Sequence, residues 1–309
     1  MGELFHTRTR GAPRPARRVL TVQALITEGA RRLARARVCF GHGTDNARDE
    51  AAVLVLHALR LRRAASGAAL SRRRVPAAAA TRARALITRR IRERIPSAYL
   101  TGVAGFAGLS FRVDPRVLIP RSPIAELIER GFAPWVEPQR VRRVLDLGTG
   151  SGCIAVAAAR ALPRARVDAV DISPAALAVA ASNVRRHRLG ARVRLVRSDH
   201  FRALRGRTYD IIVSNPPYVG ARELAGLPRE YRHEPRLALA AGRAGLDSVR
   251  IILREAARHL RPRGVLVVEV GNTELALRRA YPRLPFLWLA FERGGGGVFV
   301  LTRAQLAAP

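Results

Sequence analysis

The sequence contains no lysine, only two cysteines and no long apolar run. Because Cys39 and Cys153 lie far apart in the chain, the sequence predicts no disulfide framework. No segment approaches the roughly 18 consecutive apolar residues of a membrane-spanning helix. Residues 1–18 are rich in Arg and Pro but lack the apolar centre of a secretory signal. We therefore expect a cytoplasmic protein with no membrane partner.

The absence of lysine means that all 56 basic residues are arginines, and with 23 acidic residues they give a formal net charge of +33. Such one-sided usage is compatible with a coding bias. A charge of this size nevertheless attracts polyanions in a salt-dependent way. Two interpretations stay open: an Arg-rich surface that contacts an RNA-rich partner such as rRNA, or solubility alone.

Residue spacings typical of a metal site are also missing. Neither His42 nor His57 has a Cys, His or acidic partner at such a spacing, so we interpret both as surface or packing residues. We therefore expect no metal.

The length of 309 residues suits about two domains. After a flexible tail over residues 1–18, apolar residues at helical spacing predict helices over 19–36, 47–61 and 76–95, and hence a helical domain over 19–97. Either Asp45 or Asn46 could cap the second helix. In a linker over 98–139, glycines among aromatic and β-branched residues predict a hairpin, followed by a helix that begins at Pro123 and is capped by Ser122.

Residues 140–309 alternate regularly between apolar strands and helices. The pattern predicts an α/β domain whose mostly parallel sheet has helices on both faces, and the glycines at 294–296 predict an antiparallel hairpin at its edge. The predicted strands span 144–147, 166–170, 193–197, 209–214, 265–270, 286–290 and 297–301, and the predicted helices span 153–162, 174–187, 245–260 and 273–281.

One strand of this domain leads directly into a glycine-rich turn, V-L-D-L-G-T-G-S-G over Val144–Gly152. Glycines let the backbone approach a ligand where a Cβ would collide, and such a ligand faces the N-terminus of the next helix. The third glycine comes one residue earlier than in a dinucleotide fingerprint and Cys153 takes its place, which favours a cofactor without a pyrophosphate. Asp171 ends the next strand, where an acid can hold ribose hydroxyls. A plain βα turn with a helix N-cap is the alternative.

A second motif follows another buried strand, N-P-P-Y over Asn215–Tyr218. Consecutive prolines stiffen the loop and remove backbone donors while leaving carbonyl acceptors. An amide side chain beside such a turn suits the binding of both hydrogens of a planar NH₂ group, and Tyr218 offers a stacking face for it. The alternative is a rigid loop with a turn-forming Asn.

The two motifs together resemble the class I S-adenosylmethionine-dependent methyltransferases that act on exocyclic or amide nitrogens. Over residues 19–305 the chain is similar to the HemK/PrmB family of protein-glutamine methyltransferases. Three segments resemble its PrmB branch: F-G-H-G-T-D-N over 40–46, V-L-I-P-R-S-P over 117–123 and E-Y-R-H-E-P over 230–235. The release-factor branch typically has P-R-P-E-T-E where this chain has P-R-S-P-I-A over 120–125.

This resemblance implies a Rossmann-like methyltransferase fold with S-adenosylmethionine as cofactor, and a substrate-recognition role for the helical domain over 19–97. It implies methylation of a glutamine side-chain amide nitrogen in large-subunit ribosomal protein three, either free or in an assembly precursor of the large subunit. The alternatives are glutamine methylation of a peptide chain release factor, methylation of an adenine amine in nucleic acid, and a non-enzymatic RNA-binding assembly factor. Cys153 disfavours an NAD-dependent oxidoreductase.

The resemblance also implies a role for each motif residue. The glycine turn wraps the methionine part of the cofactor, with Asp146 near its amino group and Asp171 on the ribose. Asn215 and the Pro216 carbonyl accept hydrogen bonds from the substrate amide. The family usually has an apolar residue where this chain has His200. The expected cofactor-binding residues are Asp146, Gly148, Thr149, Gly150, Ser151, Gly152, Asp171, Asn215, and, flanking adenine, Asp199 and His200; the expected catalytic residues are Asn215, Pro216, Pro217 and, packing on the amide, Tyr218 and Phe106.

Overall fold

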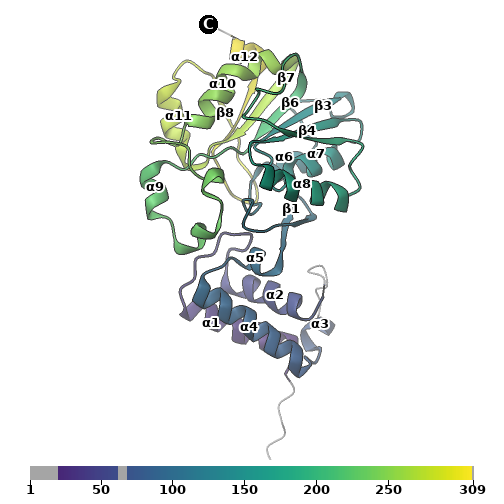
Figure 1. Ribbon diagram of the computed structural model, residues 1–309, viewed down its shortest axis with the longest axis vertical. Helices are drawn as coiled ribbons and strands as arrows, with labels where there is room; N and C mark the ends of the chain where they lie inside the picture. The colour runs from purple at the N-terminus through teal and green to yellow at the C-terminus, as the bar shows by residue number, and fades with distance from the viewer. Residues whose placement is uncertain (1–19, 62–67, 308–309) are drawn as a thin grey trace, which may run out of the picture.

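The computed structural model describes residues 20–61 and 68–307, which form a group of N-terminal helices and a larger domain built on a sheet (Figure 1). The predicted tail over 1–18 lies outside the described residues. Cys39 and Cys153 are both free, as expected. Within the described ranges, no helix is long and apolar enough to cross a membrane.

The N-terminal helices pack around a core of leucine, valine and alanine side chains, with Leu25, Leu33 and Leu54 fully buried. Thr21 caps the first helix, and Asn46 rather than Asp45 caps the second by accepting a hydrogen bond from the Asp49 amide at 2.9 Å. The structure confirms the expected helices as α1 (Val22–Arg35), α2 (Ala47–Ala58) and α4 (Ala77–Glu93), and adds α3 (Ala68–Arg72) and α5 (Ser97–Thr101).

The predicted helix bounds were too long by one to three residues in this part of the chain. Helix α4 ends at Glu93 rather than 95 because Arg94 takes a left-handed φ of 59° just before Pro96. Helix α3 lies between the predicted helices over 47–61 and 76–95, where the arginine-rich sequence predicted no helix, and Leu70 packs against the core of the N-terminal helices.

The linker contains the predicted hairpin and helix. Strands β1 (Val103–Phe106) and β2 (Leu109–Arg112) pair antiparallel, and helix α6 follows (Ile124–Glu129). The predicted start at Pro123 was one residue early. The N-cap residue is Pro123 rather than the predicted Ser122, and Ser122 Oγ accepts a hydrogen bond from the Ile124 amide at 3.2 Å from the position before the cap.

The large domain holds a seven-stranded sheet with the order β5-β4-β3-β6-β7-β9-β8. Strands β5 to β7 run parallel, while β9 and β8 form the expected antiparallel edge. The strands are β3 (Arg143–Leu147), β4 (Arg166–Asp171), β5 (Val193–Arg197), β6 (Tyr209–Ser214), β7 (Leu260–Glu269), β8 (Leu287–Trp288) and β9 (Val298–Thr302).

Alternate side chains of the central strands pack into two separate hydrophobic cores, one on each face of the sheet. In β6, Ile211 and Val213 face the core beneath α6, α7 and α8, whereas Ile212 faces the core beneath α10 and α11. Figure 1 shows the two helix layers on opposite faces of the sheet. The helices are α7 (Cys153–Ala161), α8 (Pro174–Arg186), α10 (Asp247–His259), α11 (Glu274–Ala280) and α12 (Arg303–Ala307).

The long connection after β6 contains short helical turns that the sequence did not predict. They are α9 (Ala221–Gly226), η2 (Arg229–His233) and η3 (Arg236–Ala238), with η1 (Pro138–Arg140) and η4 (Gly271–Thr273) elsewhere. Strand β7 also begins five residues before the expected 265, because Leu260 pairs with Tyr209 across a bulge.

Register places two strand ends side by side. Leu147 of β3 pairs with Ser214 of β6, so Gly148 and Asn215 leave the sheet as neighbours. The two motifs that the sequence singled out therefore meet at the carboxyl edge of the sheet, where ligands bind in open α/β folds.

One buried amide ties the linker to this edge. Asn183 of α8 is fully buried, and its side chain accepts from the Arg112 amide at 2.7 Å and donates to the Arg112 carbonyl at 2.9 Å and the Ser151 carbonyl at 2.8 Å. Asn183 thereby joins the β1–β2 hairpin and the glycine turn to one helix.

We expect Asn183→Ala to lower the free energy of unfolding by about 3 kcal/mol, because it leaves buried backbone groups without partners. Urea unfolding followed by circular dichroism measures the change. Asn272→Ala is the control, since Asn272 is exposed and its side chain donates to Glu223 at 3.2 Å on the surface. Equal effects of the two substitutions would contradict the assigned role.

Candidate active site

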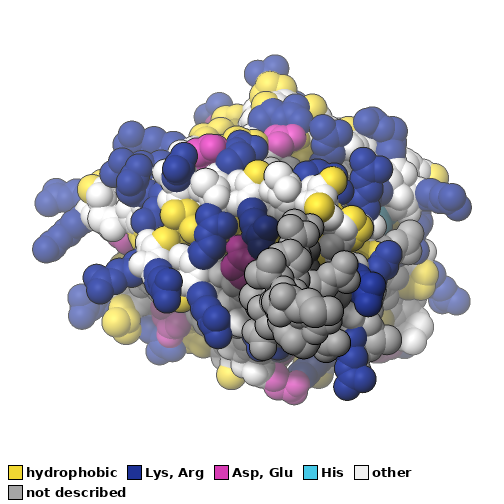
Figure 2. Space-filling view, turned by 90° about the horizontal axis from the view of Figure 1, so that it is seen from below, with side chains coloured by type: hydrophobic (Ala, Val, Ile, Leu, Met, Phe, Trp, Pro, Cys, Tyr) yellow, Lys and Arg dark blue, Asp and Glu magenta, His cyan; other side chains and the backbone are white. Residues whose placement is uncertain are grey.

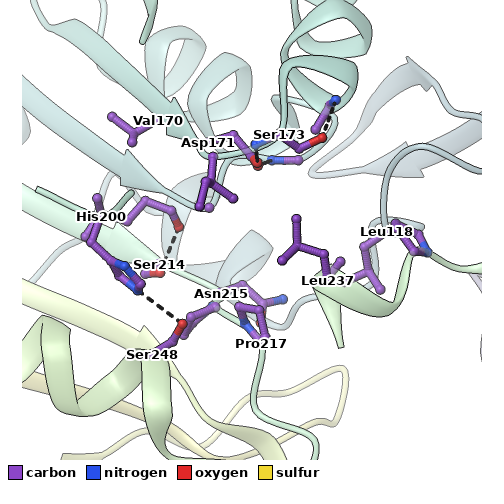
Figure 3. Close-up of a pocket in the computed structure, with 18 of the residues that line it drawn as sticks. Leu118, Val170, Asp171, Ser173, His200, Ser214, Asn215, Pro217, Leu237 and Ser248 are labelled. Carbon is purple, nitrogen blue, oxygen red and sulfur yellow. Dashed lines mark hydrogen bonds between the residues drawn. The ribbon is translucent and has the colours of Figure 1, made fainter. Parts of the chain in front are cut away.

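A pocket opens at the carboxyl ends of β3, β4 and β6 (Figure 3). Its floor comes from the glycine turn and the ends of β4 and β6, and its outer wall comes from residues 116–118 and 235–240. Of the predicted site residues, it brings together Gly148, Gly150, Asp171, Asp199, His200, Asn215, Pro216 and Pro217.

The three glycines of the turn have two roles: two of them line the pocket, and the third allows a helix to pack closely. Gly148, Gly150 and Gly152 all have positive φ, of 72°, 54° and 78°. Gly148 and Gly150 line the pocket, and a Cβ on Gly148 would lie 4.0 Å from the Asn215 carbonyl oxygen. A Cβ on Gly152 would instead lie 3.1 Å from Ala180 Cβ on α8, so this glycine permits close helix packing. Thr149 and Ser151 do not line the pocket and are buried in the turn.

Asp146 lies fully buried beneath this turn. Its Oδ2 accepts from Thr149 Oγ1 at 2.6 Å and from the Ala155 amide at 3.1 Å, while its Oδ1 has no partner in the described structure. Ser151 Oγ, also buried, lacks a partner as well. Burial raises the pKa of Asp146 to about 7, more than the two hydrogen bonds lower it. Two buried polar groups therefore retain hydrogen-bonding capacity directly under the pocket.

Asp171 ends β4 and faces the pocket. Its Oδ2 accepts from the Gly150 amide at 2.9 Å and its Oδ1 from the Ser173 amide at 2.8 Å. Burial raises the pKa of Asp171, which these backbone hydrogen bonds partly offset. Each oxygen keeps a further lone pair for a ligand hydroxyl.

Asp199 and His200 occupy the other end of the pocket, beside Ser248 of α10. His200 Nδ1 lies 2.7 Å from Asp199 Oδ1, and Nε2 lies 3.1 Å from Ser248 Oγ. Both ring nitrogens thus face protein partners, and the dashed line in Figure 3 marks the contact with Ser248. The imidazole can offer a ligand its ring face rather than its nitrogens.

The Asn215 side chain has no such partner. Among the described residues, none forms a hydrogen bond with its carboxamide, although Asn215 lines the pocket between Ser214 and Pro217 (Figure 3). A polar side chain that lines a pocket and has no protein partner is available to bind a ligand.

Tyr218 lies just outside the pocket and is held from several directions. Its hydroxyl donates to Glu269 Oε1 at 3.1 Å, and burial raises its pKa. A Cβ on Gly271 would lie 2.5 Å from the Tyr218 ring, so only glycine leaves room for it. Phe106 packs edge-on against Phe111 in the core, with ring centroids 6.4 Å apart, and does not line the pocket. The predicted contacts of Tyr218 and Phe106 with a substrate stay predictions.

Glu269 is the residue of this region that the sequence reasoning missed. It is the last residue of β7, is 5% exposed, and accepts from Ser122 Oγ at 2.5 Å as well as from Tyr218. Burial raises its pKa, against the lowering effect of these hydrogen bonds. The signal was present, because a lone carboxylate follows the apolar run over 265–268 at the same edge of the sheet as Asp171 and Asn215.

The sheet, the glycine turn, the acid that ends β4 and the N-P-P-Y turn that follows β6 define a class I S-adenosylmethionine-dependent methyltransferase. The family model of the methyltransferase small domain matches residues 132–226, and that of the PrmC N-terminal domain matches residues 24–102. The chain belongs to the family of the ribosomal protein uL3 glutamine methyltransferases.

Relatives in this family match almost the whole chain. The uL3 glutamine methyltransferase of Xanthomonas campestris pv. campestris is 50% identical, with 93% of each chain covered. That of Bordetella pertussis is 49% identical, covering 93% of this chain and 96% of the relative. Among solved structures, a methyltransferase from Pyrococcus furiosus is 20% identical with a TM-score of 0.47, covering 63% of this chain and 89% of that one.

The residues present fit S-adenosylmethionine, the methyl donor of this class. The unpartnered oxygen of Asp146 suits a neighbouring ammonium group, and Asp171 suits vicinal hydroxyls. Leu147, Val170 and Ile252 give the pocket the apolar surface that a purine ring needs.

We expect Asp146 to make the donor-free protein less stable as pH rises from about 4 to about 7. The folded state keeps this proton up to a pKa of about 7, whereas the unfolded state releases it near the model-compound value of 3.8. The folded state thus binds more protons in this interval, so the free energy of unfolding falls with pH.

Urea unfolding at a series of pH values measures this slope. Asp146→Asn removes the titrating group and should make the fall between pH 4 and 7 shallower, with substitution of the exposed Asp45 by Asn as the control. An unaltered slope in Asp146→Asn would show that the carboxyl ionises normally in the fold.

Proposed function

We propose that this protein methylates the side-chain amide nitrogen of a glutamine in ribosomal protein uL3, with S-adenosylmethionine as donor. The observation that carries the proposal is the meeting of Gly148 and Asn215 at one pocket, which places a donor-binding turn beside a free carboxamide. Relatives that are 47–50% identical over nearly their whole length are named for this activity.

The donor side of the pocket is assigned to the glycine turn and the acids around it. In this proposal, the backbone at Gly148 and Gly150 holds the methionine part of the donor. Asp146, buried beneath the turn, compensates the positive charge of the methionine ammonium group. Asp171 accepts from the ribose hydroxyls, and the apolar walls with His200 enclose the adenine. The support is that these groups line or underlie one continuous pocket.

The acceptor side is assigned to the N-P-P-Y turn. Asn215 Oδ1 and the Pro216 carbonyl accept hydrogen bonds from the two N–H groups of a glutamine amide. These two bonds fix the plane of the amide and the direction in which its nitrogen faces the donor. Pro216 and Pro217 have no backbone N–H, so the turn presents acceptors without competing donors. Tyr218, held by Glu269 and fitted against Gly271, limits the position of the amide from the outside.

A glutamine nitrogen is a weak nucleophile because its lone pair is delocalised into the carbonyl. The bound donor supplies a strongly electrophilic sulfonium methyl. The protein must therefore align the nitrogen with this methyl and stabilise positive charge as it grows on the nitrogen. Asn215 Oδ1 and the Pro216 carbonyl do both, and their attraction strengthens as the N–H groups become more acidic. The alkylated nitrogen loses its proton readily, so no general base is assigned.

We assign recognition of the protein substrate to the helical domain over 19–97. Figure 2 shows arginine side chains spread over the face of the molecule that these helices form. Arg31 and Arg35 of α1 and Arg92 of α4 are exposed, and none has an acidic partner among the described residues. A surface of this kind supports contact with rRNA in an assembly precursor. A ribosomal substrate would place the reaction in the cytoplasm, where ribosomes are assembled.

We expect Asn215→Ala to lower the rate of methyl transfer by at least ~100-fold, because it removes an acceptor that acts on developing charge. The affinity for S-adenosylmethionine should remain close to that of the unaltered protein, as measured by calorimetry. Turnover near normal in this variant would reject the role of Asn215.

Labelled methyl transfer tests the substrate. Ribosomal particles and free uL3 from cells that lack this enzyme are incubated with the protein and labelled donor, and the modified peptide is identified by mass spectrometry. Label on a glutamine of uL3 supports the proposal. Label on a release factor or on nucleic acid would instead favour one of the alternative substrates.

A further inference from the structure

Residues 230–241, here called the bridging segment, contact three parts of the molecule that are distant in sequence. The segment follows the N-P-P-Y turn and contains the 3-10 helical turn η3. One end is fastened to the N-terminal helices, its middle to the linker, and the other end forms the outer wall of the donor pocket.

The first end is held by Glu230 through buried charges. Its Oε1 accepts from the Cys39 amide at 3.0 Å, from Arg90 at 3.1 Å and from Arg94 at 3.4 Å. Arg90 is fully buried and also binds Glu50 at 2.6 Å. Such a network holds its members in one geometry, because any displacement leaves a charge buried without its partner.

The middle is held by Glu234, whose side chain is inaccessible to solvent. Arg121 donates to both of its oxygens, at 2.6 and 2.7 Å, and the Ile119 amide donates at 3.0 Å. Val117 and Leu118, just before Ile119, form the facing wall of the pocket. Glu234 therefore fixes the distance between the two walls.

The other end reaches both the pocket and the N-P-P-Y turn. Pro235, Leu237, Ala238 and Ala240 line the pocket, and Figure 3 shows Leu237 beside Leu118 across from Asn215. The Val219 amide donates to the Leu239 carbonyl at 2.8 Å, and the Ala241 amide donates to the Val219 carbonyl at 3.0 Å. Val219 directly follows Tyr218, so the segment is bonded to the exit of the catalytic turn.

We propose that Glu230 is a positioning residue for methyl transfer. By binding Arg90 and the Cys39 amide, it transmits the position of the N-terminal helices through the bridging segment to the pocket wall and to Val219. Its importance for methyl transfer rests on the proposed function, whereas its effect on the donor pocket does not. A protein substrate that binds the N-terminal helices is thereby presented to a pocket of defined width.

The test uses Glu230→Gln in the full-length protein. Glutamine has nearly the same volume as glutamate and still offers an acceptor to the Cys39 amide. Arg90 retains its ion pair with Glu50, so we expect the variant to fold. The matched control is Glu126→Gln. Glu126 is also a buried carboxylate that accepts two backbone amides, of Glu292 at 3.0 Å and Arg293 at 2.8 Å, but it does not contact the bridging segment.

We expect amide hydrogen exchange at Val219 and Ala241 to speed up about tenfold in donor-free Glu230→Gln, and the dissociation constant for S-adenosylmethionine to rise by a similar factor. Glu126→Gln should change neither, even where its melting temperature falls as far. A lower melting temperature in Glu230→Gln with unchanged exchange and donor affinity would overturn the proposal.

The two proposals fail in different ways. Exchange and donor binding need no protein substrate, so they test Glu230 even where uL3 accepts no methyl group. If the unaltered protein methylates uL3 and Glu230→Gln does so with an unchanged kcat/KM, the positioning role is overturned while the proposed function stands.

Discussion

The parallel pairing of β3 with β6 is the constraint on which the site depends. Each strand ends in a turn with its own chemistry, and neither turn alone defines a reaction. The pairing of Leu147 with Ser214 makes Gly148 and Asn215 neighbours, so the glycine turn and the free carboxamide share one pocket. A shift of one residue in this register would exchange the side chains that β6 places in the two cores, so the packing of both cores enforces it.

The features that could be predicted from the sequence are those that depend on local pattern. Buried strands show as apolar runs, and the glycine turn and the N-P-P-Y turn carry their conformational reasons in their own residues. Strands β5 and β6 match their predicted bounds for this reason, and the antiparallel edge is present, although β8 has two residues where five were predicted. The bounds that failed, such as the early start of β7, were set by pairing with a distant strand.

The features that could not be predicted depend on contacts between distant residues. Glu230 and Arg90 are 140 positions apart, and nothing near either residue indicates its partner. The turns η2 and η3 also lack an apolar period, and polar contacts of Glu230 and Glu234 with distant residues hold them in place. Glu269 lies between these cases, because its place at a strand end was visible while its contact with Tyr218 was not.

Because the chain has no lysine, arginines supply the cations at the contact between the N-terminal helices and the sheet domain, here called the joint. The cations at this joint, Arg90, Arg94 and Arg121, are guanidinium groups, which stay charged at every pH a cell experiences. Buried lysines would lose protons readily and loosen such a joint. Burial raises the pKa of Glu234, but the hydrogen bonds from Arg121 and the nearby His42 ring, whose Nε2 lies 3.6 Å from Oε2, outweigh this and lower the pKa to about 2, so its charge is equally permanent. The ion pairs that these arginines form with Glu230 and Glu234 therefore keep both of their charges across the physiological pH range.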